Sequence, residues 1–120
     1  MVMPASWQAT PSIPHTFADG TSNTLLFAEK YARCGEGGSL WGRAEADLWQ
    51  PAFAAWSKAP FQARPAPAEC DPRRASTPFA GGMQVALADA SVRALAASVS
   101  PATWWAACTP DGGEVLGNDW

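Results

Sequence analysis

The chain has 120 residues, of which 48% are hydrophobic and 16% charged, and its formal net charge is −3. This composition argues for one small folded domain and against a disordered chain. The acidic balance and the scattered basic residues give no electrostatic footprint for nucleic acid. No apolar run approaches the ~20 residues that span a membrane. We therefore expect neither a nucleic-acid partner nor a membrane span in this chain.

Residues 1–16 are polar and rich in proline, which predicts an extended N-terminal arm. A single domain over residues 17–120 follows. The whole chain contains 11 Pro, 10 Gly and 7 Trp, which predicts a fold of loops and strands with large rigid side chains as anchors. The first residues have neither a basic nor an apolar region, so we expect no signal peptide.

A turn is predicted at Asp19-Gly20, before residues 24–33. These residues alternate in part, with Leu25, Phe27, Glu29 and Tyr31 on one side, which is typical of a strand. Their content of Leu, Ala, Glu and Lys also favours a helix. We expect Glu29 to have a structural role, either facing solvent or paired with Arg93 or Lys30.

The middle of the chain gives weaker signals. Residues 35–38 form a glycine-rich loop without the lysine of a phosphate-binding loop, and residues 39–42 suit a short strand. Trp49, Phe53 and Trp56 are at helical spacing, so residues 43–61 form either a short helix or an irregular loop anchored by aromatic side chains. Residues 63–78 predict a long proline-rich surface connection.

Residues 83–95 alternate apolar and polar side chains on both sides of Asp89, which predicts a β-hairpin. A two-residue loop at Asp89-Ala90 would place three cross-strand pairs on the buried face: Leu87 with Val92, Val85 with Ala94, and Met83 with Ala96. Ala90 would then need a positive φ, where glycine is usual. Either the turn has another shape or the chain is strained there.

A helix is predicted over residues 102–108, because Ser100 and Pro101 suit the cap and the first helical position, and Pro110 ends it. Trp104 and Trp105 are about 100° apart on that helix, so only one can point fully inward. The other is expected to cover a neighbouring loop.

Three cysteines, Cys34, Cys70 and Cys108, are widely spaced, which argues against a zinc site and allows at most one internal disulfide. If the domain lies outside the cytoplasm, we favour a disulfide between Cys34 and Cys70. The alternative is that all three are reduced and partly buried.

His15 is the only histidine, and nothing in the sequence places two carboxylates in one pocket, so we expect no enzyme and no catalytic residues. The glycine-rich C-terminal tail offers four oxygen ligands of the kind that calcium uses: Asp111, Glu114, Asn118 and Asp119. They are calcium candidates, although acidic glycine loops are commonly only loops. No other cofactor is expected.

The tryptophans Trp41, Trp49, Trp56, Trp104 and Trp105 are either core anchors or a stacking surface for carbohydrate or another subunit.

Three segments in order resemble a bacterial family of prepilin-like proteins of unknown function that ends in an H-x9-DG segment. Residues 17–30 are similar to its strand with the sequence DGTSNT and a following Glu, and residues 100–120 are similar to its C-terminal tail. Between them, Gly81-Gly82, Asp89 and Ser91-Val92-Arg93 match, whereas Phe79 replaces the histidine and Ala90 the glycine.

The resemblance favours a strand over residues 24–33 and implies a small β-rich α+β domain: an antiparallel sheet, long loops and a short C-terminal helix. Such families begin with a basic leader and a long apolar helix, so we expect this chain to be the globular head without that helix. The implied role is a non-enzymatic structural or accessory subunit of a type II secretion-like or pilus-like assembly. Its partners would be pilin-like subunits or other proteins of the cell envelope. Major pseudopilins carry calcium in a C-terminal loop, which agrees with the calcium candidates.

The alternative function is a secreted module that binds polysaccharide or protein through Trp-rich loops.

Overall fold

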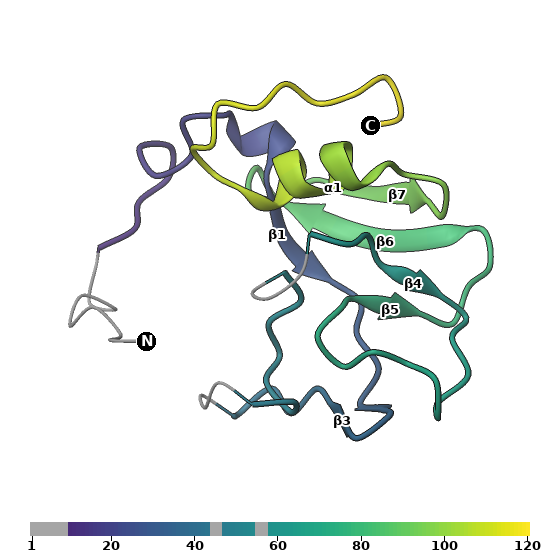
Figure 1. The fold of residues 1–120 in the computed structure, drawn as a ribbon. Helices are drawn as coiled ribbons and strands as arrows, with labels where there is room; N and C mark the ends of the chain where they lie inside the picture. Colours follow the sequence, from purple (N-terminus) through teal and green to yellow (C-terminus); the bar gives the residue numbers. More distant parts are fainter. Residues whose placement is uncertain (1–9, 44–46, 55–57) are drawn as a thin grey trace.

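The structure is a computed structural model that describes residues 10–43, 47–54 and 58–120. Its largest sheet has three antiparallel strands in the order β1-β6-β7, formed by Leu25–Ala28, Gly82–Leu87 and Val92–Ala96. The helix α1, Pro101–Cys108, packs with this sheet, and the C-terminal tail runs past α1 (Figure 1). The described residues thus form a small α+β domain with antiparallel strands and a short C-terminal helix, as the sequence predicted.

The remaining elements are short. The 3₁₀ turn η1, Thr21–Asn23, leads into β1; β2 (Arg33–Cys34) pairs antiparallel with β3 (Gly37–Gly38); and β4 (Gln62–Ala63) pairs parallel with β5 (Ser76–Thr77). The strand predicted at residues 39–42 is therefore wrong, because β3 lies two residues earlier, within the glycine run. A Cβ at Gly37 would collide with the carbonyl oxygen of Leu48, so glycine lets these segments approach closely.

The β6–β7 hairpin is confirmed, but its register differs by one residue from the prediction. Val85 lies opposite Arg93, Met83 opposite Leu95, and Ala86 opposite Val92. The loop has three residues rather than two: Ala90 N donates to Leu87 O (3.0 Å) and Leu87 N donates to Ser91 O (2.9 Å). This is a turn followed by a left-handed residue, and Ala90 has φ 68°.

The shift in register exchanges the faces of β7. Met83, Val85 and Leu87 are buried as predicted, but their neighbours on β7 are Arg93 and Leu95. Val92 and Ala94, predicted to be buried, point to the other face and are exposed. The side chains of opposite residues share a face, so one extra loop residue moves all of β7.

A β-bulge interrupts β1 between Leu25 and Phe27. Leu25 lies opposite Leu87 and is buried, whereas Phe27 lies opposite Ala86 and is 70% exposed. The prediction that Leu25 and Phe27 share one side is therefore wrong, because an extra residue in one strand reverses the alternation beyond it. Ala28 returns to the buried side, opposite Val85.

The core lies between the sheet, α1 and the loops before β5. Its centre is Trp104, which is 0% exposed. The centroid of its ring lies 5.7 Å from that of Phe61 and 6.1 Å from that of Phe53. Burial of a tryptophan removes about 200 Å² from water, which contributes roughly 5 kcal/mol. Trp105 points away and is half-buried, with Lys58 Nζ 4.8 Å above its ring. The two adjacent tryptophans therefore divide as expected.

The start of α1 is confirmed. The Ser100 side chain accepts a hydrogen bond from Thr103 N (3.3 Å), and Pro101 occupies the first helical position. Between residues 43 and 61 the structure describes residues 43, 47–54 and 58–61, and none of these is helical. This favours the loop anchored by aromatic side chains. Trp56 lies outside the described residues.

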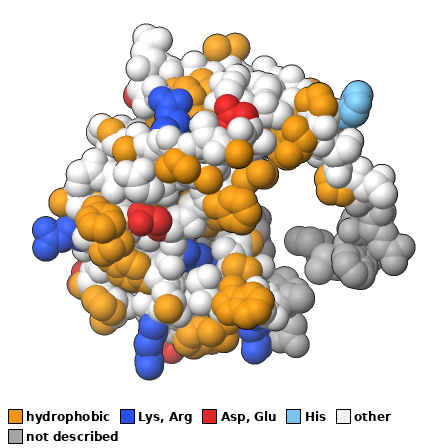
Figure 2. Space-filling view, turned by 180° about the vertical axis from the view of Figure 1, so that it is seen from behind, with side chains coloured by type: hydrophobic (Ala, Val, Ile, Leu, Met, Phe, Trp, Pro, Cys, Tyr) orange, Lys and Arg blue, Asp and Glu red, His pale blue; other side chains and the backbone are white. Residues whose placement is uncertain are grey.

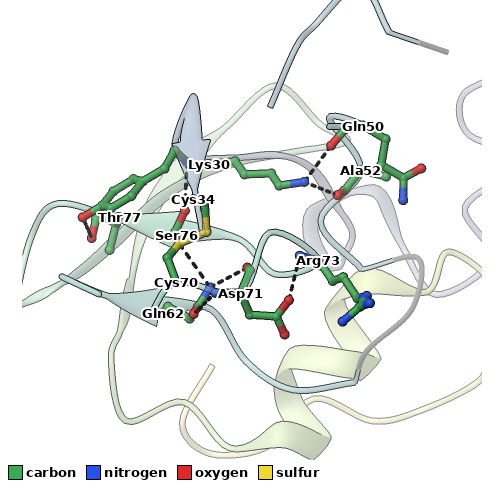
Figure 3. Close-up of a disulfide and its surroundings, with 11 residues drawn as sticks. Lys30, Cys34, Gln50, Ala52, Gln62, Cys70, Asp71, Arg73, Ser76 and Thr77 are labelled. Atoms are coloured by element: carbon green, nitrogen blue, oxygen red, sulfur yellow. Dashed lines mark hydrogen bonds between the residues drawn. A yellow bond between two sulfur atoms is a disulfide. The ribbon is translucent and has the colours of Figure 1, made fainter. Parts of the chain in front are cut away.

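Cys34 and Cys70 form a disulfide, as favoured from the sequence, and their Cα atoms are 5.0 Å apart. The Gln62 side chain braces the same loop: its Nε2 donates to Asp71 O, and Asp71 N donates to its Oε1, both at 2.9 Å (Figure 3). The disulfide thus ties β2 to the connection between β4 and β5. That connection is a braced loop rather than a loose surface segment.

Candidate functional site

The face of the sheet opposite the core carries an exposed apolar row. Phe27, Ala86 and Val92 lie side by side across the three strands, because Phe27 is paired with Ala86 and Ala86 with Val92. Phe27 is 70% and Val92 67% exposed. We call these three residues the outer row. Contiguous exposed apolar patches, when they are large, mark interaction surfaces, so this row is the candidate for such a surface.

The outer row is flanked by two hollows that meet at Phe27 and Ala28. One measures about 290 Å³ and is lined by Ala86 and Val92 with Glu29 and Gln84 at its polar side. The other measures about 520 Å³ and continues beyond β1, over Leu26 and residues 51–53. Viewed from behind, the molecule exposes several groups of hydrophobic side chains with sparse acidic side chains among them (Figure 2).

The charged side chains beside the outer row make hydrogen bonds to the backbone within the domain. The Glu29 carboxylate accepts a hydrogen bond from Gln84 N (3.4 Å), where β1 no longer provides a partner for β6. The pairing of Glu29 with Arg93 or Lys30, one of the two alternatives for this residue, is therefore not formed. Lys30 Nζ donates instead to Gln50 O (2.6 Å) and Ala52 O (2.9 Å), as Figure 3 shows. Burial lowers the pKa of Lys30, although Asp71 opposes that effect.

The four calcium candidates do not converge on one point. Asp119 lies at the start of α1, where its Oδ2 accepts from Ser100 N (2.6 Å) and its Oδ1 from the Thr103 hydroxyl. Glu114 lies at the other end of α1, where its Oε2 accepts from Thr109 Oγ1 (3.1 Å). An eight-residue helix is about 12 Å long, so one ion cannot bind both carboxylates in this arrangement.

Asp111 is exposed in the tail, and Asn118 lines a groove of about 610 Å³ with Glu114 and with Asp19 of the turn before η1. The sequence offered Asp19 only as a turn residue, and its carboxylate accepts from Gly113 N (3.0 Å). Within the described ranges, no three or more His, Cys, Asp or Glu side chains form a group that could hold a metal ion. Calcium stays a prediction; its test is a melting temperature that rises with calcium and ceases to rise in Asp111→Asn.

His15, the only candidate for histidine catalysis, is exposed in the N-terminal arm. Among the carboxylates, Asp47 is bonded to Arg43 (2.7 Å) and to Trp49 N (2.8 Å), and Asp89 accepts from Ser91 in the hairpin turn (2.6 Å from Oγ). Hydrogen bonds from Trp49 N and Arg43 lower the pKa of Asp47. Those from the Ser91 hydroxyl and backbone lower the pKa of Asp89. Both carboxylates therefore serve local turns.

The tryptophans divide into several environments. Trp104 is a core anchor, whereas Trp49, Trp105 and Trp120 are half-buried. Trp41, which the sequence offered as a core anchor or a stacking surface, is 94% exposed and so fits the second reading. The outer row was missed altogether in the sequence, since the bulge at Leu26 and the loop length at Ala90 decide which face Phe27 and Val92 occupy.

No family model matches the chain, and no curated protein and no solved structure is significantly similar to it. In the part of the chain that the structure describes, no helix has the length and apolar character needed to cross a membrane.

Proposed function

We propose that this domain is a non-enzymatic structural or accessory subunit of a type II secretion-like or pilus-like assembly in the cell envelope. Its outer row packs against an apolar helix of a neighbouring pilin-like subunit. The observation that carries the proposal is the row itself: Phe27, Ala86 and Val92 form an uncovered apolar line across the sheet. An apolar helix is the complementary partner, because it supplies side chains to the hollows and needs no ion pairs.

Two further observations support this proposal. The resemblance of three ordered segments to prepilin-like proteins implies a head domain that works beside long apolar helices. The Cys34–Cys70 disulfide fits a protein that folds outside the reducing cytoplasm, as envelope subunits do.

Site-specific photo-crosslinking in bacteria that produce the protein tests the proposal. A photoreactive amino acid at Phe27 or Val92 should form adducts whose cross-linked peptides come from the apolar helix of a pilin-like subunit. The same amino acid at Val115, which is 92% exposed in the tail, is the matched control and should not form those adducts. Adducts at Phe27 that map to other kinds of protein, or equal yields at Val115, would contradict the proposal.

The second candidate function is a secreted module that binds polysaccharide by stacking. Trp41 favours it, because a tryptophan that is 94% exposed presents a full ring face to a sugar. Retention on insoluble polysaccharides should then be lost in Trp41→Ala and kept in Phe79→Ala, which removes another exposed aromatic ring. Equal retention of both variants would remove this candidate.

A further inference from the structure

β7 is an edge strand, paired with β6 on one side only. Leu87 N donates to Ser91 O, which places this pair at a hydrogen-bonded position of the ladder, and such positions alternate along an antiparallel pair of strands. Val85–Arg93 and Met83–Leu95 are therefore hydrogen-bonded, and the N–H and C=O groups of Val92 and Ala94 point away from β6. No other described residue provides a hydrogen bond to those outward groups.

The edge of β7 lacks the devices that usually prevent strand addition. Proteins protect edge strands with lysine, proline, bulges or a covering segment. The outward residues are Val92, Ala94 and Ala96, all neutral and exposed, and the pairing of β7 with β6 runs without a bulge. The Ala96 carbonyl at the end of the strand accepts a hydrogen bond from Val99 N (3.1 Å), so it would be shared with Val92 N of a second strand. The charged residue of the strand, Arg93, is on the core side, where its guanidinium lies 4.4 Å from the centre of the Trp120 ring.

We propose that β7 pairs with β7 of a second copy of this chain, antiparallel about a two-fold axis at Ala94. The two three-stranded sheets then become one continuous sheet. Residues with outward groups must lie opposite each other in an antiparallel pair, so Ala94 faces Ala94 of the second copy and Val92 faces its Ala96. Each contact occurs twice by symmetry, which makes the surface self-complementary.

Charge and side-chain size select this register and this partner. A shift of the axis to Arg93 would put two arginines directly opposite each other, which is destabilising. With the axis at Ala94, Arg93 faces Leu95 of the second copy, and the pairs at the axis are alanine with alanine and valine with alanine. Small neutral side chains let the backbones approach at the strand spacing of ~4.8 Å. The outer rows of both copies then lie on one continuous face.

This inference does not depend on the proposed function, because it concerns the strand edge rather than the sheet face. Sedimentation equilibrium of the whole chain over rising concentration should show a reversible monomer–dimer equilibrium. Ala94→Lys and Ala94→Glu should each weaken the dimer at least about tenfold, since each places like charges on the axis. An equimolar mixture of the two variants should restore dimers, because the pair on the axis is then Lys with Glu.

Gln84→Lys is the matched control, because Gln84 is exposed on the same face but lies on the central strand β6, directly beside Ala94. It should dimerise as the parent does. Circular dichroism melting confirms that each variant is folded. Cys108→Ser should also keep the dimer, which separates strand pairing from an intermolecular disulfide through the free Cys108. A chain that is monomeric at every concentration, a dimer unaffected by Ala94→Lys, or a dimer lost in Cys108→Ser would overturn the proposal.

Discussion

The guanidinium of Arg93, on β7, lies 4.4 Å from the ring centre of Trp120, the last residue of the chain. The preceding residue, Asp119, is bonded to Ser100 and Thr103 at the start of α1. The end of the tail is therefore held at two points, one on the sheet and one on the helix. Trp120 also packs against the core cluster, so the tail closes the side of the core next to β7.

The Arg93–Trp120 contact predicts a measurable coupling. A cation over an aromatic face contributes about 0.5–1 kcal/mol at a partly exposed site. In a double-mutant cycle with Arg93→Gln and Trp120→Leu, urea unfolding should give a coupling free energy of that size. Arg93→Gln combined with Trp105→Leu provides the control, because Trp105 contacts Lys58 instead, and these two changes should be additive. Additive effects at Arg93 and Trp120 would show that the ring contact does not stabilise the fold.

Ala90→Gly should stabilise the protein by about 0.5–1 kcal/mol, because Ala90 has φ 68° and glycine adopts that conformation without a Cβ penalty. The urea midpoint should rise with no change in the slope of the transition. The matched control is Ala94→Gly in β7, where glycine should lower stability by about 0.5–1 kcal/mol. A midpoint that stays constant or falls in Ala90→Gly would mean that the turn does not hold Ala90 in the left-handed region.

Removal of the disulfide should destabilise the protein strongly. Cys34 and Cys70 are 36 residues apart, and a loop of that length corresponds to about 4 kcal/mol of denatured-state entropy in the chain-entropy relation. The double variant Cys34→Ser/Cys70→Ser should lose most of that amount in denaturant unfolding. Cys108→Ser removes the other thiol, which lies outside the disulfide, and should change stability far less. Equal losses in the two variants would mean that loop closure by the disulfide contributes little.

The elements with local signals could be predicted from the sequence. The hairpin follows from alternation on both sides of Asp89, and α1 follows from Ser100 and Pro101. The pairing of Cys34 with Cys70 was one of two open alternatives. The register could not be predicted, because it depends on whether Ala90 belongs to a two- or three-residue loop. One residue of loop length decides whether Val92 or Arg93 faces the core.

The position of Phe27 has a similar cause. Alternation from Leu25 places it inside, and the bulge at Leu26 turns it outward, although nothing in the local sequence marks that bulge. The tail acids show a different limit. The sequence offers their oxygen atoms as ligands, but the partners of Asp119 and Glu114 are backbone and hydroxyl groups at the two ends of α1, which only the fold brings near.

Asp119 makes the stability of the fold depend on acid. Hydrogen bonds from the Thr103 hydroxyl and from Ser100 N lower the pKa of Asp119 to about 2. The unfolded chain binds the proton at about 3.9, so the stability that the carboxylate contributes is complete above that pH. It is lost as the pH falls through the folded pKa of about 2. Asp119→Asn should therefore lower the melting temperature at neutral pH and flatten its decline over this acid window.

Asp111→Asn is the control for that experiment, because Asp111 is exposed in the same tail and should leave the acid decline as steep as in the parent protein. Asp89 contributes in the same direction, since its pKa is also lowered, so the Asp119 variant should keep part of the slope. A decline in Asp119→Asn as steep as the parent's would show that the carboxylate does not stabilise the start of α1. The tail would then be held by Trp120 and its apolar contacts rather than by the hydrogen bonds of Asp119 with Ser100 and Thr103.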